Sequence, residues 1–162
     1  MEEIIQEINI RRAELNDVPA ILMLIEELAE YEKLSDDVIA TEDKLKNVLF
    51  GDDQFVEVYL AEYRNEIAGQ VIFFKNFSTF IAKPGLFIED LYVRPQFRSK
   101  GIGKKLLLKV VEIAKERDYG RIEWNVLDWN KPAITFYEQI GAVPLNEWIT
   151  FRLTAEKFES LL

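Results

Sequence analysis

The sequence has 162 residues, of which 49% are hydrophobic and 30% charged, with 7 glycines and 5 prolines. This composition excludes a disordered or collagen-like chain, and the length favours one globular domain over residues 1–162. The absence of cysteine and histidine excludes disulfides, cysteine nucleophiles and histidine-based catalysis. We therefore expect no metal site, and any catalysis must use carboxylates, tyrosine, lysine or backbone amides.

The charge is acidic overall and basic in one stretch. The formal net charge is -9, from 29 acidic and 20 basic residues. This balance argues against a nucleic-acid partner, because phosphate attraction needs a basic face. Between Leu91 and Val111 there are six basic residues and no acidic one, which predicts one local anionic ligand on a surface that attracts cations. The six are Arg94, Arg98, Lys100, Lys104, Lys105 and Lys109.

Segments that would target the chain to a membrane are not evident in the sequence. No apolar run reaches the roughly 18 to 20 residues that a membrane span requires. The start at Met1, Glu2 and Glu3 lacks the basic and then apolar order of a signal peptide. We expect a cytoplasmic protein without a membrane partner.

The first fifty residues predict one strand and two helices. Residues 8–12 alternate in polarity, as a half-buried strand does. Asn16 or Asp17 is expected to cap the first helix, which continues at helical spacing of apolar residues. A shorter helix is expected from Thr41 to about Leu49.

The middle of the chain predicts an antiparallel meander. Three segments rich in aromatic and β-branched residues, 55–63, 67–77 and 86–93, are expected to be strands. The turn residues 64–66 separate the first two strands, and 83–85, which include Pro84 and Gly85, are expected in the connection to the third.

The last third of the chain predicts alternating helices and strands. A helix is expected over 103–116, a strand over 121–126 and a helix opened by Pro132. A last strand near 149–153 then leads into a short helix capped by Thr154. The fold class is α+β, with a central mixed, mostly antiparallel sheet flanked by helices.

The turn between the strand at 86–93 and the long helix is the most informative segment. Gly101 and Gly103 let the backbone approach a ligand without a Cβ in the way. The amides at the start of the helix point outward with the positive end of the helix dipole behind them, which suits a pyrophosphate. Such a turn can also simply end a strand. Charge-assisted bonds to phosphate could come from Arg98, Lys100 and Lys104.

Two other nucleotide-binding motifs do not fit this turn. A Walker loop would place Ser or Thr after the Gly-Lys pair, whereas Gly103 and Lys104 are followed by Lys105. A dinucleotide fingerprint would place a third glycine where Leu106 stands.

The pattern Arg98-x-x-Gly101-x-Gly103 resembles the coenzyme A loop of the GNAT superfamily of N-acetyltransferases. The resemblance extends over most of the chain and is strongest to the diamine branch, the spermidine/spermine acetyltransferases and their relatives. It implies acetyl-CoA as cofactor, a small cationic amine as substrate and a homodimer. The segments that carry it are 26–32, 88–93, 129–137, Gly141-Ala142 and Glu147-Trp148.

The resemblance also implies which residues bind coenzyme A. The backbone of a splayed strand would hold the acetyl carbonyl and the pantetheine arm, and the loop would hold the diphosphate. The residues concerned are Leu91, Tyr92 and Val93 of the strand, Arg98, Ser99, Lys100, Gly101, Ile102, Gly103 and Lys104 of the loop and helix start, and Asn130, Pro132 and Tyr137.

Two residues are the candidates for proton transfer. Tyr137 lies where the family has its general acid, and its phenol can protonate the departing thiolate. It could instead be a half-buried aromatic whose hydroxyl bonds to the backbone. Glu89 is the candidate base, directly or through water, because an alkylamine with a pKa of about 10 must lose a proton before attack. Glu89 could instead only bind substrate or neutralise a neighbouring base, and Asp90 is its substitute.

Acidic and aromatic residues are the candidates for binding the amine. Carboxylates pair with ammonium groups, and an indole face attracts cations. The acids of the first helix, Glu26, Glu27, Glu30 and Glu32, could equally form a solvated face. The substrate residues that the resemblance implies are Tyr31, Glu32, Glu89, Asp90, Glu147 and Trp148.

The sequence thus predicts an acetyl-CoA-dependent N-acetyltransferase with a polyamine as the first substrate candidate and a lysine analogue such as thialysine as the second. A protein-directed or aminoglycoside-type acetyltransferase is possible within the same fold. A non-catalytic acyl-CoA sensor is the alternative from another class, and the presence of both Tyr137 and Glu89 favours an enzyme.

Overall fold

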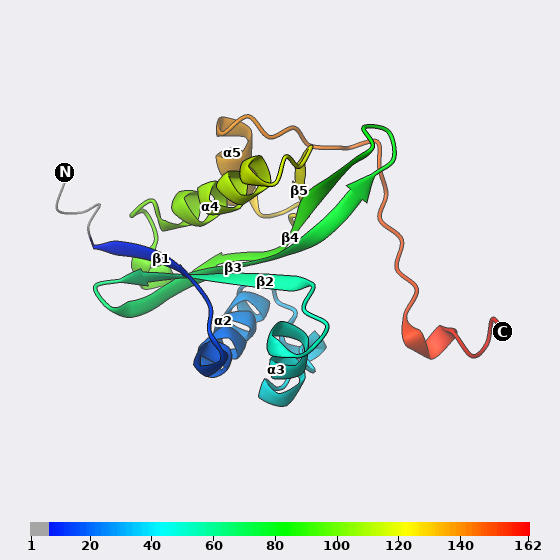
Figure 1. Ribbon diagram of the computed structural model, residues 1–162, viewed down its shortest axis with the longest axis horizontal. Helices are drawn as coiled ribbons and strands as arrows, with labels where there is room; N and C mark the ends of the chain where they lie inside the picture. Colours follow the sequence, from blue (N-terminus) through cyan, green and yellow to red (C-terminus); the bar gives the residue numbers. More distant parts are fainter. Residues whose placement is uncertain (1–6) are drawn as a thin grey trace. The chain divides into compact units, whose positions relative to one another are not determined.

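Five strands form one sheet in the order in which they occur along the chain, in a computed structural model that describes residues 7–162 (Figure 1). The first four strands pair antiparallel with their neighbours, and the fifth pairs parallel with the fourth. The predicted α+β class with a mixed, mostly antiparallel sheet is confirmed. The strands are β1 (Ile8–Arg12), β2 (Val56–Tyr63), β3 (Glu66–Ser78), β4 (Lys83–Val93) and β5 (Ile122–Trp124).

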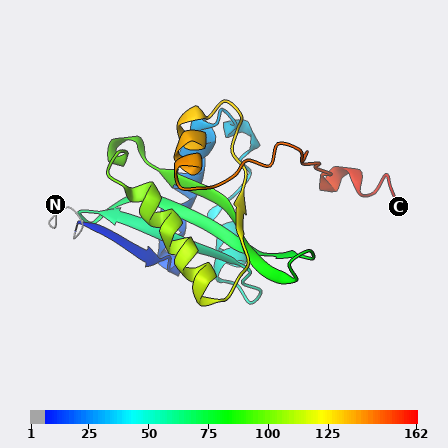
Figure 2. The same ribbon diagram turned by 90° about the horizontal axis from the view of Figure 1, so that it is seen from above.

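Helices cover both faces of this sheet. α4 (Ile102–Glu116) crosses one face, as seen from above in Figure 2. α2 (Val18–Tyr31) and α3 (Glu42–Phe50) lie on the opposite face. Both α2 and α4 are amphipathic, so each buries one apolar stripe against the strands.

The core between α2, α3 and the sheet fixes the strand that carries the candidate site. Ile21 and Leu24 of α2 are fully buried in one cluster with Leu60 and Ile72 of the sheet. Tyr92 of β4 belongs to the same cluster. Because burying a large aliphatic side chain contributes about 1.5–3 kcal/mol, this packing holds β4 firmly against α2.

The chain divides into two units. The first extends to Asn125 and holds the whole sheet with α2, α3 and α4, and the second comprises Val126–Leu162. The second unit contains α5 (Lys131–Gln139), with Pro132 in its first turn as predicted. Gly141 follows α5 with a φ of +93°, a left-handed conformation that glycine adopts readily at a helix end.

Two predictions for the C-terminal segment are wrong. Residues 149–153 form no regular strand, and Phe151 is 91% exposed. Alternating polarity satisfies one face of a strand, but a strand also needs a neighbour for its backbone hydrogen bonds. The expected terminal helix is a short 3-10 turn at Ala155–Lys157, and Thr154 makes no side-chain capping bond there.

Several element boundaries also differ from the prediction. β4 begins at Lys83, so Pro84 and Gly85 lie inside the strand and pair with β3 rather than forming the connection. β5 is three residues long, shorter than the predicted 121–126. Asp17 precedes α2 without a side-chain capping bond, because its carboxylate accepts hydrogen bonds from Arg11 instead.

The prediction for the start of α3 is confirmed. The Thr41 hydroxyl accepts a hydrogen bond from the amide of Lys44, as a side-chain cap does. No helix within residues 7–162 is long and apolar enough to cross a membrane.

Candidate active site

The second half of β4 has an open edge. β3 pairs with β4 over its whole length, whereas β5 pairs with β4 only from Leu86 to Ile88. The register between β3 and β4 shifts where Ile72 is opposite Asp90 and Phe73 is opposite Ile88. Glu89 is therefore the bulged residue, and a bulge bends and twists its strand. The two parallel strands separate beyond this point.

The hydrogen-bond alternation shows which backbone groups of β4 face the open edge. The amide of Arg94 donates to the carbonyl of Ala68 over 2.9 Å, so Arg94 and Ala68 form a hydrogen-bonded residue pair. Hydrogen-bonded and non-hydrogen-bonded residue pairs alternate along an antiparallel ladder. The backbone groups of Tyr92 therefore face β3, and those of Leu91 and Val93 face away from it. The open edge thus offers backbone groups to an extended, amide-bearing ligand, although the carbonyl of Val93 also accepts a hydrogen bond from Arg98 Nε.

A left-handed turn connects this edge to α4. Gly101 has a φ of +79° and directly precedes the helix. A Cβ on Gly101 would meet no atom within 4 Å, so the backbone conformation rather than crowding requires glycine. The first helical hydrogen bond runs from the Lys105 amide to the Gly101 carbonyl over 3.0 Å. The amides of Ile102, Gly103 and Lys104 precede that bond and lie at the positive end of the helix dipole.

Two loop cations contact tyrosine rings. Arg98 donates through Nε to the carbonyl of Val93 over 3.0 Å, and its guanidinium lies 4.9 Å from the centroid of the Tyr31 ring. Lys100 Nζ lies 5.2 Å from the centroid of the Tyr63 ring. The structure therefore places Tyr31, which sequence reasoning assigned to the amine, against the predicted coenzyme A loop.

Two carboxylates influence that of Asp90 near the bulge. Burial, followed by the charges of Glu89 and Glu32, raises the pKa of Asp90 to about 6. Burial also raises the pKa of Glu32. Glu89 is exposed at the bulge. The structure thus brings together three residues that the sequence predicted for the amine, from β4 and from the end of α2.

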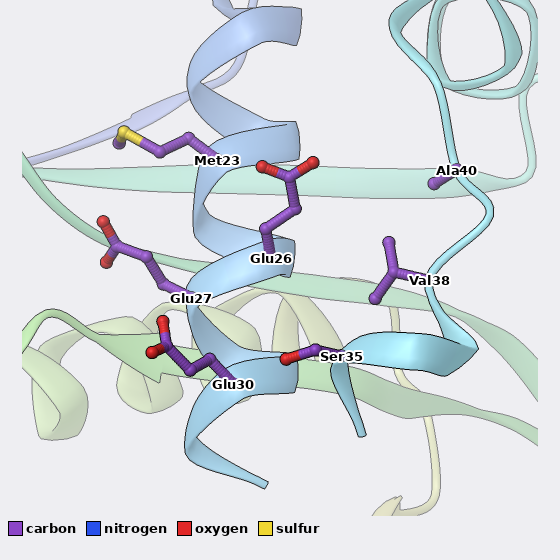
Figure 3. A pocket seen from close by; sticks show the side chains of 7 residues that line it. All are labelled: Met23, Glu26, Glu27, Glu30, Ser35, Val38 and Ala40. Atoms are coloured by element: carbon purple, nitrogen blue, oxygen red, sulfur yellow. The ribbon is translucent and has the colours of Figure 1, made fainter. Parts of the chain in front are cut away.

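A cavity of about 400 Å³ lies beside α2 (Figure 3). Glu26, Glu27 and Glu30 project from α2, so the helix acids line a cavity rather than only a solvated face. Three negative side chains in one concavity favour a cationic occupant. The lining is completed by Met23 and by Ser35, Val38 and Ala40 of the segment that follows α2.

Glu27 connects this cavity to β4, a link that sequence reasoning missed. The Tyr92 hydroxyl donates to the Glu27 carboxylate over 3.3 Å, and Arg94 Nε donates to the same carboxylate over 3.2 Å. Burial and the charge of Glu27 raise the pKa of Tyr92. More than sixty residues separate these partners along the chain, so no local pattern could have indicated the contact.

The remaining predicted residues belong to the second unit. Tyr137 lies in α5, and its ring centroid is 5.4 Å from that of Phe136. Asn130 directly precedes α5, and Pro132 lies in its first turn. Glu147 and Trp148 follow α5 in an irregular segment and are exposed.

Comparison with known proteins identifies the class. The sequence pattern of the acetyltransferase (GNAT) family matches residues 20–142, and the chain belongs to this family. Its members generally use acetyl-CoA as the acetyl donor. The relatives that match it over nearly their full length are N-acetyltransferases, and this chain is an enzyme of that kind.

Three relatives show the range of acceptors named within this group. The chain is 37% identical to the thialysine N-epsilon-acetyltransferase of Bos taurus, with 94% of this chain and 95% of that protein covered. It is 34% identical to an L-ornithine N5-acetyltransferase of Arabidopsis thaliana, with 94% and 86% covered. It is 30% identical to a human spermidine/spermine N(1)-acetyltransferase-like protein, with 91% of this chain and 23% of that protein covered.

Solved structures share the fold. An integron cassette protein of Vibrio cholerae superimposes with a TM-score of 0.78 at 25% identity, covering 96% of this chain and 97% of that chain. A metagenomic aminoglycoside acetyltransferase solved with sisomicin also gives a TM-score of 0.78, at 22% identity, with 93% and 98% covered.

Proposed function

We propose that this enzyme transfers the acetyl group of acetyl-CoA to a primary amine of a small cationic substrate. The observation that carries the proposal is the open edge of β4, where Leu91 and Val93 turn their backbone groups outward beside the start of α4. That edge suits the amide-bearing pantetheine arm, and the helix start suits the diphosphate.

A thialysine-type side-chain amine is the first candidate acceptor. The supporting finding is the match to thialysine and ornithine acetyltransferases over nearly the full chain. A polyamine is the second candidate, and the observation that favours it is the cavity lined by Glu26, Glu27 and Glu30, because several carboxylates suit several ammonium groups. Glu32 and Asp90 would hold the reacting end of either substrate, together with Glu147 and Trp148 as the resemblance implies.

The proposed reaction is a direct attack. Glu89, through water or directly, accepts a proton from the ammonium group, and the neutral amine nitrogen then attacks the thioester carbonyl carbon. The bond between that carbon and sulfur breaks, and Tyr137 donates a proton to the departing thiolate. The nitrogen loses its second proton, which returns through water to the Tyr137 phenolate, so that the products are the acetylated amine and the coenzyme A thiol. The outward amides of β4 would stabilise the oxyanion that develops on the carbonyl. Asp90, with its raised pKa, is the substitute for Glu89.

The donor would be held by the strand, the loop and α5. Leu91, Tyr92 and Val93 would contribute backbone groups, and Asn130 and Pro132 would contact the pantetheine. The loop residues are Arg98, Ser99, Lys100, Gly101, Ile102, Gly103 and Lys104. The exposed bases Arg98, Lys100 and Lys104 support this assignment, because no acidic residue interrupts the stretch from Leu91 to Val111.

We further propose that residues 1–162 act as one catalytic domain and that two copies form a homodimer in the cytoplasm. The GNAT family match supports one domain, because it crosses the boundary after Asn125. Exposed apolar side chains at Trp148, Ile149 and Phe151 support an interface. Light scattering of the full chain tests the homodimer, and a monomer at micromolar concentration would contradict it. Cell fractionation tests the cytoplasmic location.

An amine-panel assay tests the function. Release of coenzyme A from acetyl-CoA would be followed with a thiol reagent, to which a chain without cysteine contributes no background. The panel would contain thialysine, ornithine, putrescine, spermidine, spermine and a lysine-bearing peptide. Turnover with one of the small amines supports the proposal. Tight coenzyme A binding without turnover on any amine would indicate a sensor instead.

A further inference from the structure

Tyrosine rings from different elements support the two exposed cations of the loop. The Arg98 guanidinium lies 4.9 Å from the ring centroid of Tyr31, at the end of α2, and 5.8 Å from that of Tyr92 in β4. Lys100 Nζ lies 5.2 Å from the ring centroid of Tyr63, at the end of β2. All three distances are within the range of cation–π attraction.

The backbone ties Arg98 through one hydrogen bond, from Nε to the carbonyl of Val93, and this bond does not fix the remainder of the two basic side chains. Arg98 and Lys100 are exposed, and Ser99 between them has a φ of +62°. Long basic side chains lose considerable rotamer freedom when they grip an anion, which weakens binding. A ring that already holds the cation reduces this loss before the ligand arrives.

The rings are themselves held in place. Tyr63 shares a hydrogen bond with Glu7, and its ring centroid is 5.9 Å from that of the buried Phe97. Tyr31 is partly buried at the last residue of α2. Each loop cation therefore contacts a ring that belongs to α2 or β2 rather than to the loop itself.

We propose that Tyr31 and Tyr63 are positioning residues of the donor site, which hold Arg98 and Lys100 ready for the phosphates of acyl-CoA. This inference rests on the proposed function and gives Tyr31 a role on the donor side rather than on the amine side. It predicts that the two rings strengthen the binding of acyl donors that carry phosphate and do not change the binding of donors without phosphate.

The experiment compares acetyl-CoA with acetyl-pantetheine, which has the same thioester arm without the nucleotide phosphates. Tyr31→Leu and Tyr63→Leu should each raise the KM for acetyl-CoA about 2- to 5-fold, the range that an exposed cation–π contact supports. Their kcat/KM with acetyl-pantetheine and their KM for the amine should stay within about 2-fold of the parent enzyme. Tyr31→Phe and Tyr63→Phe keep the ring and should restore most of the affinity.

Tyr119→Leu is the matched control. Tyr119 contacts Lys75 and Arg117 at 5.9 and 6.0 Å, outside the loop, so its loss should change the KM for neither donor. Three outcomes would overturn the inference. The Leu variants could raise the KM for both donors equally, Tyr31→Leu could raise the KM for the amine, or only one of the two Leu variants could raise the KM for acetyl-CoA. A parent enzyme that binds no coenzyme A would instead refute the proposed function, so the two failures are distinguishable.

Discussion

The two halves of β4 share a strand but differ in their neighbours. Leu86 to Ile88 are paired with β3 on one side and β5 on the other, and Leu86 and Ile88 are buried. Beyond the bulge at Glu89, β3 is the partner on one side and the other side is open to a ligand. The comparison teaches that β4 is part of the closed sheet as far as Ile88, whereas unpaired backbone groups lie on one side of it where pairing with β5 ends, which is the edge that the proposed function uses.

The largest expected effect is that of Tyr137→Phe. Removing the phenolic hydroxyl should lower kcat about 100- to 10,000-fold, the usual contribution of a general acid, with the KM for acetyl-CoA nearly unchanged. Steady-state kinetics with the best amine of the panel measure it. Full activity would remove Tyr137 from the mechanism and leave the open half of β4 as a binding edge only.

Glu89→Gln tests the bulge between the two halves. If Glu89 is the base, kcat should fall at least about 100-fold at neutral pH, and the shape of the pH–rate profile should change. A pH–rate profile of both enzymes measures this. An unchanged profile in Glu89→Gln together with an altered one in Asp90→Asn would assign the base to Asp90.

Gly101→Val tests the turn at the end of the open half. Valine is strongly disfavoured at a φ of +79° and would place a side chain where phosphate approaches, so the Kd for coenzyme A should rise at least about 10-fold. Calorimetric titration measures it. Gly101→Asn is the control, because asparagine tolerates this conformation better and should weaken binding less. Unaltered affinity in Gly101→Val would show that the turn is not the phosphate site.

Asp90→Asn tests the electrostatics of the open half through stability. Burial raises the folded-state pKa of Asp90 to about 6, above the value of 3.8 for an unperturbed carboxyl. Between pH 3.8 and about 6, Asp90 is mostly protonated in the folded protein and mostly ionised in the unfolded chain. Raising the pH through this window therefore lowers the free energy of unfolding, and the whole destabilisation is present above about pH 6. Urea unfolding should find the variant more stable than the parent by on the order of 1 to 2 kcal/mol at pH 7.5, after allowance for partial exposure.

The same difference should vanish well below pH 3.8, where Asp90 is protonated in both the folded and the unfolded state. Glu57→Gln is the control of opposite sign, since the hydrogen bonds from Arg117 lower the pKa of Glu57. That substitution should destabilise the protein at neutral pH and lose its effect on acidification. A gain in the free energy of unfolding of Asp90→Asn that does not depend on pH would contradict the conclusion that burial of Asp90 raises its pKa.

The smallest effect is expected in the closed half. Ile88→Val removes one buried methylene and should lower the free energy of unfolding by about 1 kcal/mol, with kcat/KM unchanged within about 2-fold. Unfolding and steady-state kinetics on the same preparation measure both. A loss of activity without a loss of stability would mean that the two halves of β4 are not functionally distinct.

Local signals predicted most of the fold but not its long-range contacts. The period of apolar residues located α2 and α4, and Thr41 marked the start of α3. The apolar alternation at 149–153 predicted a strand that the structure lacks, because pattern alone supplies no pairing partner. The loop glycines were evident, whereas the contacts of Tyr31 with Arg98 and of Tyr92 with Glu27 join distant segments that no spacing relates.

By itself, the sequence determined the chemistry available to this protein: no histidine or cysteine, a basic stretch before a long helix, and glycine at the one loop position where φ is +79°. Only the tertiary structure decided where β5 leaves β4, which backbone groups face the open edge, and which rings meet the loop cations. The reason is physical. Conformational preference and polarity act within a few residues, whereas strand register, bulge position and side-chain contacts depend on how the whole core packs.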